Sequence, residues 1–220
     1  MSLLSVIMGI PVIVMSIILH EVAHGWAAYI NGDPTAKQAG RLTLNPIPHI
    51  DLQGTIIIPG VLLALRYITG LPFWVIGWAK PVPINPSYFG NWRNGMAMTG
   101  AAGPLTNIII AVFLSFLYKI LSLSCDLTVQ ASFIFHFGQA IIFAGLINIF
   151  LAVFNLIPIP PLDGSRIVVA FLRPNQIRKY LSLERFGLGL VIAFLFLGGF
   201  RILFPIVTFL FSIIFGISLS

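Results

Sequence analysis

The stretch that decides the fold is LLSVIMGIPVIVMSIILHEVAHGWAAYI, residues 3–30. Such a run is long enough to cross a bilayer, because a spanning helix needs about 20 predominantly apolar residues. Residues 3–19 carry no charge, yet the run then places two histidines and a glutamate close together. A charged side chain at bilayer depth costs at least about 2.5–3.5 kcal/mol on insertion scales. Three such groups therefore indicate a shared partner, with hydrogen bonding to other helices as the less favoured alternative.

The composition of the whole chain predicts an integral membrane protein. Of its 220 residues, 58% are hydrophobic and 8% are charged, whereas a soluble domain has about 25% charged residues. The length leaves room for about five or six membrane segments and little else. The net charge of +6 comes from short connections, where Lys and Arg set membrane topology. No basic and aromatic patch indicates nucleic acid as a partner. We therefore predict an all-α polytopic membrane protein.

Further apolar segments and the breaks between them predict the rest of the architecture. Apolar runs also occupy residues 96–121, 133–154 and 186–217, the last interrupted by Gly198-Gly199, Arg201 and Pro205. The last run is too long for one crossing at 1.5 Å per residue, so we expect a turn near 199–205. Residues 52–79 are apolar but interrupted by Gly and Pro, which predicts a re-entrant region or a pair of short segments. A short membrane-associated β strand is expected at 40–44, and residues 80–95 are expected to form a proline-rich loop or a pair of strands.

The domain organisation is predicted to be simple. The chain is interpreted as one integral-membrane domain, residues 1–220. Its catalytic core is expected at about residues 1–172, and C-terminal membrane segments at about 186–217.

The motif HEVAH at residues 20–24 predicts a metal site. Positions i and i+4 lie on one face of a helix, so His20 and His24 can both reach one ion. The arrangement is typical of zinc metalloproteases, in which the glutamate of the motif acts as general base. That role falls to Glu21, and the cofactor is predicted to be one catalytic Zn²⁺.

A catalytic zinc usually has three protein ligands, so a third ligand is needed. Asp163 is the preferred candidate among the remaining histidines and acids, because it follows the prolines of IPIPPLDG at residues 157–164. Prolines end the preceding helix, and irregular backbone at membrane depth must be buried in protein or line a wet cavity. An N-cap of the helix that starts near Ser165 is a second possible role, compatible with the first.

Taken together, three motifs resemble the site-2 protease family of intramembrane zinc metalloproteases, in the small bacterial form without a PDZ domain. They are HEVAHG at 20–25, GPLTN at 103–107 and NLIPIPPLDG at 155–164. The resemblance implies zinc ligands at His20, His24 and Asp163, and Glu21 as general base. It also implies that Asn155 contacts the substrate backbone or stabilises the oxyanion. Asn107 is expected either to contact substrate or to pack helices. Substrates of the family are transmembrane proteins or their remnant peptides.

The predicted ligands constrain the topology. The two histidines lie in the second half of the first helix, and Asp163 follows the end of the 133–154 helix. These two helices should therefore run in the same direction, and 52–79 should enter and leave by one face. The basic residues then share one side: Lys37, Arg41, Lys80, Arg93 and the 166–185 connection. By the positive-inside rule that side is cytoplasmic. We expect a bacterial plasma-membrane protein whose active site opens towards the cytoplasm.

Several assignments stay open at the level of sequence. His49 and Asp51 are expected in an interfacial turn or at the entrance to the site, and His136 in a hydrogen-bonded packing role. The 40–48 and 80–86 segments are candidates to pair with an unwound substrate. Besides substrate and membrane lipids, the partners could include a second copy or a regulatory membrane protein. The alternative function is a transporter or channel with a metal or ion site. Such a protein does not need Glu21 for chemistry.

Overall fold

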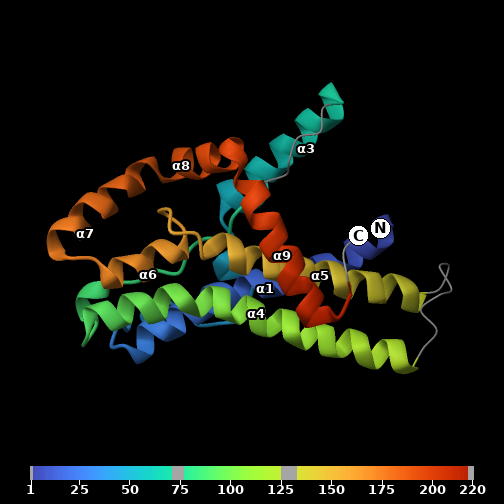
Figure 1. Cartoon of the computed structure of the whole chain (residues 1–220), viewed down its shortest axis with the longest axis horizontal. Helices are drawn as coiled ribbons and strands as arrows, with labels where there is room; N and C mark the ends of the chain where they lie inside the picture. Colours follow the sequence, from blue (N-terminus) through green and yellow to red (C-terminus); the bar gives the residue numbers. More distant parts are fainter. Residues whose placement is uncertain (1, 71–76, 125–132, 218–220) are drawn as a thin grey trace.

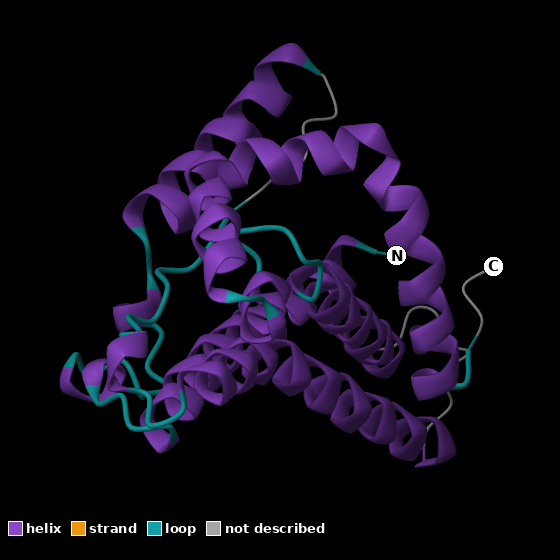
Figure 2. Cartoon of the chain, turned by 60° about the vertical axis from the view of Figure 1, so that its left-hand side comes forward, coloured by secondary structure: helices purple, strands orange, loops and turns teal. Residues whose placement is uncertain are grey.

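The structure is a computed structural model that describes residues 2–70, 77–124 and 133–217, and it contains helices and loops with no strand in these ranges (Figure 2). The predicted all-α class is therefore confirmed. The α-helices are α1 (Leu3–Ile30), α2 (Thr35–Gln38), α3 (Ile58–Thr69), α4 (Trp92–Ser124), α5 (Phe133–Asn155), α6 (Asp163–Phe171), α7 (Pro174–Leu181), α8 (Gly187–Phe194) and α9 (Phe200–Phe215). Short 3₁₀ turns are Ile47–His49, Pro86–Tyr88 and Ser182–Phe186, and π-helical turns are Leu52–Ile57 and Leu195–Gly199.

The described residues include five helical stretches that are long and apolar enough to cross a membrane. They are Leu3–Ile30, Leu52–Thr69, Trp92–Ser124, Phe133–Asn155 and Pro174–Phe215. Their outward faces carry many large apolar side chains, as expected of helices that face lipid rather than water. The chain is an integral membrane protein.

Helices α1, α4 and α5 pack together and form the centre of the molecule (Figure 1). Hydrogen bonds between side chains fix their directions. Near the start of both α1 and α5, Ser2 contacts His136, and further along both helices Asn148 donates to Ser16. The two helices are therefore parallel, as the ligand positions predicted. The bonds of Ser2 and Ser5 to His136 also give this histidine the expected packing role.

The C-terminal helix α9 packs against α4 and α5 (Figure 1). The shared core contains Ala111 and Leu114 from α4, Ile141 and Ala144 from α5, and Phe211 from α9. The break that separates α8 from α9 lies at Gly198, slightly before the predicted 199–205. Gly198 has φ 102°, a left-handed conformation that glycine adopts without steric penalty. The chain turns there, and α9 then continues through Pro205.

The 52–79 segment leaves and rejoins the protein at one place. Trp78 N–H donates to the Gly54 carbonyl at 3.1 Å, and the Thr55 hydroxyl donates to the Trp78 carbonyl at 2.9 Å. One step further, Lys80 N–H donates to the His49 carbonyl at 2.9 Å. Between these anchors α3 projects away from the rest of the molecule (Figure 1). The close ends are those expected of a hairpin; residues 71–76 lie outside the described ranges.

The strand predicted at 40–44 and the strand pair considered at 80–95 are wrong. The first segment is irregular, and the second forms the alternative that was also predicted, a loop, with a 3₁₀ turn at Pro86–Tyr88 before α4 begins at Trp92. Prolines, which cannot donate to a ladder, occupy positions 81, 83 and 86 and follow the first segment at 46 and 48. The segments meet through a side chain instead: Arg41 is buried and donates to the Lys80 carbonyl at 2.5 Å.

The basic connection predicted at 165–185 forms α6, α7 and a 3₁₀ turn. It lies beside the N-terminal end of α4, at the left in Figure 1, where α1 also ends. Arg93, near the start of α4, ties the connection down by donating to the carbonyls of Ala170 and Leu172 at 3.2 and 3.0 Å.

Candidate metal centre

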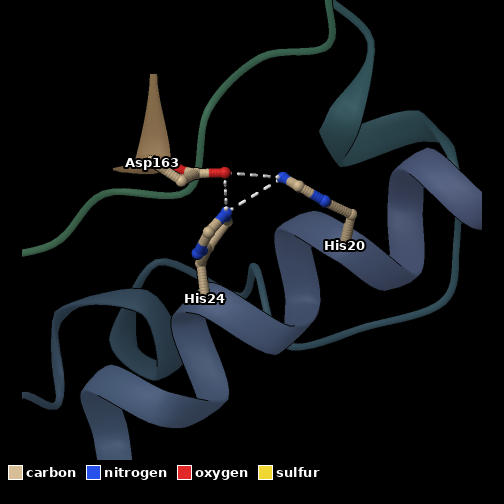
Figure 3. A group of neighbouring side chains, drawn as sticks. All are labelled: His20, His24 and Asp163. Atoms are coloured by element: carbon tan, nitrogen blue, oxygen red, sulfur yellow. Dashed lines mark hydrogen bonds and ion pairs between the residues drawn. The ribbon is translucent and has the colours of Figure 1, made fainter. Parts of the chain in front are cut away.

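The structure brings His20, His24 and Asp163 together, although the aspartate is far from the histidines in sequence (Figure 3). The two histidine Nε2 atoms are 3.0 Å apart. Asp163 Oδ2 lies 3.1 Å from Nε2 of His20 and 3.2 Å from Nε2 of His24. The three residues are only 4–8% exposed, so the group is largely shielded from bulk water.

The positions of the three side chains have local explanations in α1 and α6. The histidines lie one turn apart on α1, and both rings face the same side (Figure 3). Asp163 is the first residue of α6, because the proline-rich stretch before it cannot continue α5. The residue at the N-cap position is Leu162, so the N-cap role considered for Asp163 is wrong. Its carboxylate points towards the histidines instead (Figure 3).

The hydrogen bond made by Nδ1 of His24 fixes the tautomer of this ring. Nδ1 lies 2.6 Å from the carbonyl oxygen of Thr99 on α4. A carbonyl can only accept, so Nδ1 must carry the hydrogen. In a neutral ring, Nε2 then presents a lone pair to the centre of the group.

A network of buried amides fixes His20 in the same way. Asn148 donates through Nδ2 to the Ala144 carbonyl at 2.8 Å, so its Oδ1 must face the other way and accept. Asn107 donates to that oxygen at 2.9 Å. Oδ1 of Asn107 therefore faces Nδ1 of His20, at 2.5 Å, and accepts its hydrogen. The network ends on Ser16, which accepts from Asn148 at 3.0 Å. Nε2 of His20 is left with a lone pair, as in His24.

The resulting donor set fits a metal cation. Two lone pairs on nitrogen and a carboxylate oxygen converge, and Asp163 Oδ2 is buried with no hydrogen-bond donor. Such an arrangement is repulsive unless a cation lies between the groups. Separations of 3.0–3.2 Å are slightly below the roughly 3.3 Å edge of a tetrahedron with zinc bonds of about 2.0–2.1 Å. Two imidazoles and one carboxylate are also a common ligand set of catalytic zinc.

Gly103 of α4 forms the floor of the centre. A Cβ at this position would overlap Nε2 of His24 and lie 2.6 Å from Nε2 of His20. Gly100, one turn earlier, allows α6 to approach equally closely, since a Cβ there would lie 2.8 Å from the carbonyl oxygen of Asp163. These two glycines explain how α4 can touch both α1 and α6 at the site.

The remaining predicted site residues lie in different surroundings. Glu21 is half-buried, and its Oε2 accepts a hydrogen bond of 2.9 Å from the Val82 N–H. Asn155 ends α5, and its amide donates to the Leu151 carbonyl of its own helix at 3.0 Å. Asp51 caps the Leu52–Ile57 turn by accepting from Gly54 N–H at 2.6 Å, and this contact agrees with a turn role.

Comparison with known proteins agrees with this geometry. The chain is 37% identical to "Putative zinc metalloprotease YwhC" of Bacillus subtilis over 175 residues, 80% of this chain and 74% of YwhC. Residues 127–199 match the model of peptidase family M50. This chain belongs to peptidase family M50. The predicted family, that of the site-2 proteases, and the predicted enzyme class, a zinc metalloprotease, are thereby confirmed.

More distant relatives of this M50 peptidase carry similar names. It is 30% identical over 183 residues to "Putative zinc metalloprotease Rip2" of Mycolicibacterium smegmatis, covering 82% of this chain and 63% of Rip2. It is 36% identical over 104 residues to "Putative zinc metalloprotease MJ0611" of Methanocaldococcus jannaschii, covering 47% of each chain. No solved structure matches it significantly.

Sequence reasoning missed Asn148, Ser16 and the Thr99 carbonyl of the M50 peptidase. A signal for Asn148 was present, because an asparagine in the middle of an apolar helix must find a partner. Its partner could not be read from the sequence, since that depends on which faces of α1, α4 and α5 meet.

Asn107→Ala is expected to lower zinc affinity by about 10–100-fold, the usual effect of removing a residue that orients a metal-binding histidine. The variant takes the acceptor from His20 Nδ1 and leaves Asn148 without its donor. Zinc affinity can be measured by competition with a chelator of known strength. Thr106→Ala is the matched control, because the Thr106 hydroxyl donates to the Ala102 carbonyl of its own helix and, among the described residues, makes no bond to the ligands. Equal zinc affinity in the two variants would contradict the orienting role.

Proposed function

We propose that this chain hydrolyses peptide bonds in or near transmembrane segments of membrane proteins, with one Zn²⁺ held by His20, His24 and Asp163. The observation that carries the proposal is the buried convergence of two histidine nitrogens and a carboxylate beside Glu21. These residues lie on α1 or pack against it, and α1 is apolar enough and long enough to span a membrane. A site at that depth can only act on substrates that enter the membrane region.

When bound, zinc would lower the pKa of a water molecule and polarise the scissile carbonyl. The protein's part is to orient groups and to move protons. Glu21 takes a proton on its carboxylate and passes it to the leaving amine. The Val82 N–H holds one oxygen, Oε2, which leaves the other oxygen of Glu21 to accept the proton. Asn155 is our candidate for the donor to the developing oxyanion; it must turn away from Leu151 to serve.

The substrate and the orientation follow from the position of the site. A substrate helix must unwind locally, because its carbonyls are otherwise engaged in intrahelical hydrogen bonds. Lys37 lies in α2, which follows the end of α1, and Arg93 lies near the start of α4; α6 and α7 carry further basic residues. By the positive-inside rule this end faces the cytoplasm. We therefore propose that the site of a plasma-membrane enzyme opens there, within one domain whose core is about residues 1–172.

The function is tested with the purified protein in lipid nanodiscs and a set of model transmembrane peptides. We expect cleavage inside the apolar segment, located by mass spectrometry, which a chelator stops and added zinc restores. The competing reading, a transporter, is tested in parallel with zinc-loaded liposomes. Zinc flux without any peptide product would contradict the proposal.

A further inference from the structure

A cavity lies against α1, and its lining residues Ile17 and Ile18 are within one helical turn of His20 and Glu21. It has a volume of about 290 Å³ and an open mouth. Its walls come from three parts of the chain. These are α1, with Val14, Ile17 and Ile18; the turn that contains His49; and the end of the 52–79 segment, with Trp78 and Ala79. The lining side chains are mostly apolar, with His49 and Thr55 as polar exceptions. The volume is just below the roughly 300–1,000 Å³ of sites that hold a whole small molecule, so a single large side chain would fit inside it.

The cavity is continuous with the face of α1 that carries Glu21. Residues three, four and seven positions apart share one face of a helix, so Ile18, Ile17 and Val14 lie on the side of Glu21. At 1.5 Å per residue, Ile17 lies about 6 Å along the axis from Glu21. An extended peptide advances about 3.3 Å per residue. A substrate side chain within two residues of the cleaved bond therefore reaches the cavity.

The opposite wall also leads to the reaction centre. Trp78 and Ala79 precede Val82, whose N–H binds Glu21. The same segment is fixed to the other wall by the bond from Lys80 N–H to the His49 carbonyl. A peptide that lies along α1 beside this contact would thus pass Glu21 and the cavity in succession.

His49 supplies a polar group without a partner. The residue is 3% exposed. Its Nε2 lies 2.9 Å from the Thr43 carbonyl and must donate to it. In a neutral ring Nδ1 is therefore an acceptor, and among the described residues it is buried with no hydrogen-bond partner. A buried acceptor of this kind calls for a donor from a ligand, and an unwound substrate has free backbone N–H groups.

We propose that this cavity is a substrate subsite: it takes one large apolar side chain within two residues of the cleaved bond, and His49 Nδ1 accepts a backbone N–H of the same peptide. The inference rests on the proposed protease function. We assign the cavity to the unwound peptide rather than to a lipid chain. A peptide N–H can donate to the buried His49 acceptor, whereas an acyl chain has no hydrogen-bond donor. Selection of substrates then depends partly on the cavity walls.

The test uses photo-crosslinking of a peptide to the protein in nanodiscs. Crosslinking reports peptide binding without hydrolysis, so a failure of this inference can be distinguished from a failure of the protease function. The probe is a leucine and alanine transmembrane peptide with a central Gly-Pro break and benzoylphenylalanine at one central position at a time. We expect one position to label the cavity residues. Ala79→Phe, which fills the cavity, should reduce this labelling by about tenfold or more. Ala193→Phe, on the exposed side of α8, is the matched control and should not.

Two results would overturn the inference. One is peptide labelling that maps elsewhere or is equal in the Ala79 and Ala193 variants. The other is labelling of the cavity by a phospholipid with a photoreactive acyl chain that excess peptide does not reduce, because the cavity would then be a lipid site. His49→Phe, which keeps a ring but removes the acceptor, should weaken peptide labelling without increasing lipid labelling.

Discussion

Glu21→Gln is expected to slow peptide cleavage by about 10²–10⁴-fold, the usual contribution of a general base. The amide cannot take a proton from water, but it keeps the size of the side chain. Its oxygen can still accept from Val82 N–H, so the local backbone should stay in place. The zinc content should therefore be unchanged. Cleavage of a model peptide and bound zinc are measured on the same preparation.

The control for this variant is Glu184→Gln, which neutralises an exposed acid in the 3₁₀ turn after α7. It should cleave at the rate of the parent protein. Full cleavage by the Glu21 variant would show that the carboxylate does not move the proton. If zinc and cleavage were lost together, Glu21 would instead be needed to keep the metal ligands in place.

Gly103→Ala is expected to abolish both zinc binding and cleavage, although the added group is one methyl. The new Cβ would overlap His24 Nε2 and come within 2.6 Å of His20 Nε2. The neighbouring atoms belong to rings that are held by Thr99 and Asn107, so they cannot move away without breaking those bonds. Metal content by mass spectrometry and cleavage of the model peptide are the measurements.

Gly189→Ala is the matched control, since a Cβ there meets nothing within 4 Å. Alanine also favours helix more than glycine does, so this variant should be at least as stable as the parent. A Gly103 variant that bound zinc with parental affinity would contradict the close packing of α4 beneath the ligands.

The grouping of His20, His24 and Asp163 could be predicted from the sequence because the chemistry of these side chains is local and their burial is costly. Two histidines and a glutamate in an uncharged membrane segment require a partner, and prolines before Asp163 force a break where a carboxylate can face inward. The parallel course of α1 and α5 followed from the same requirement, since both ligand groups must reach one ion. The contacts of Ser2 and Ser16 confirm that course.

Contacts between helices could not be predicted, because they depend on which helix faces meet in the folded protein and no local sequence pattern specifies those faces. The amide network through Asn148 requires particular faces of α1, α4 and α5 to come together. The strand expected at 40–44 was wrong because alternation was given more weight than the prolines that follow it, which remove ladder donors. The role of Val82 N–H, which holds Glu21, arises only once the 52–79 segment has returned to α1.

X-ray absorption at the zinc edge, on purified parent protein and Asp163→Ala, tests whether this carboxylate completes a zinc site with the two histidines. We expect one zinc per parent chain, bound by two imidazole nitrogens and oxygen donors at about 2.0–2.1 Å, and loss of tightly bound zinc in Asp163→Ala. Asp51→Ala, which removes a turn cap, should keep the parental spectrum. A spectrum and zinc content unchanged by loss of the Asp163 carboxylate would contradict the account.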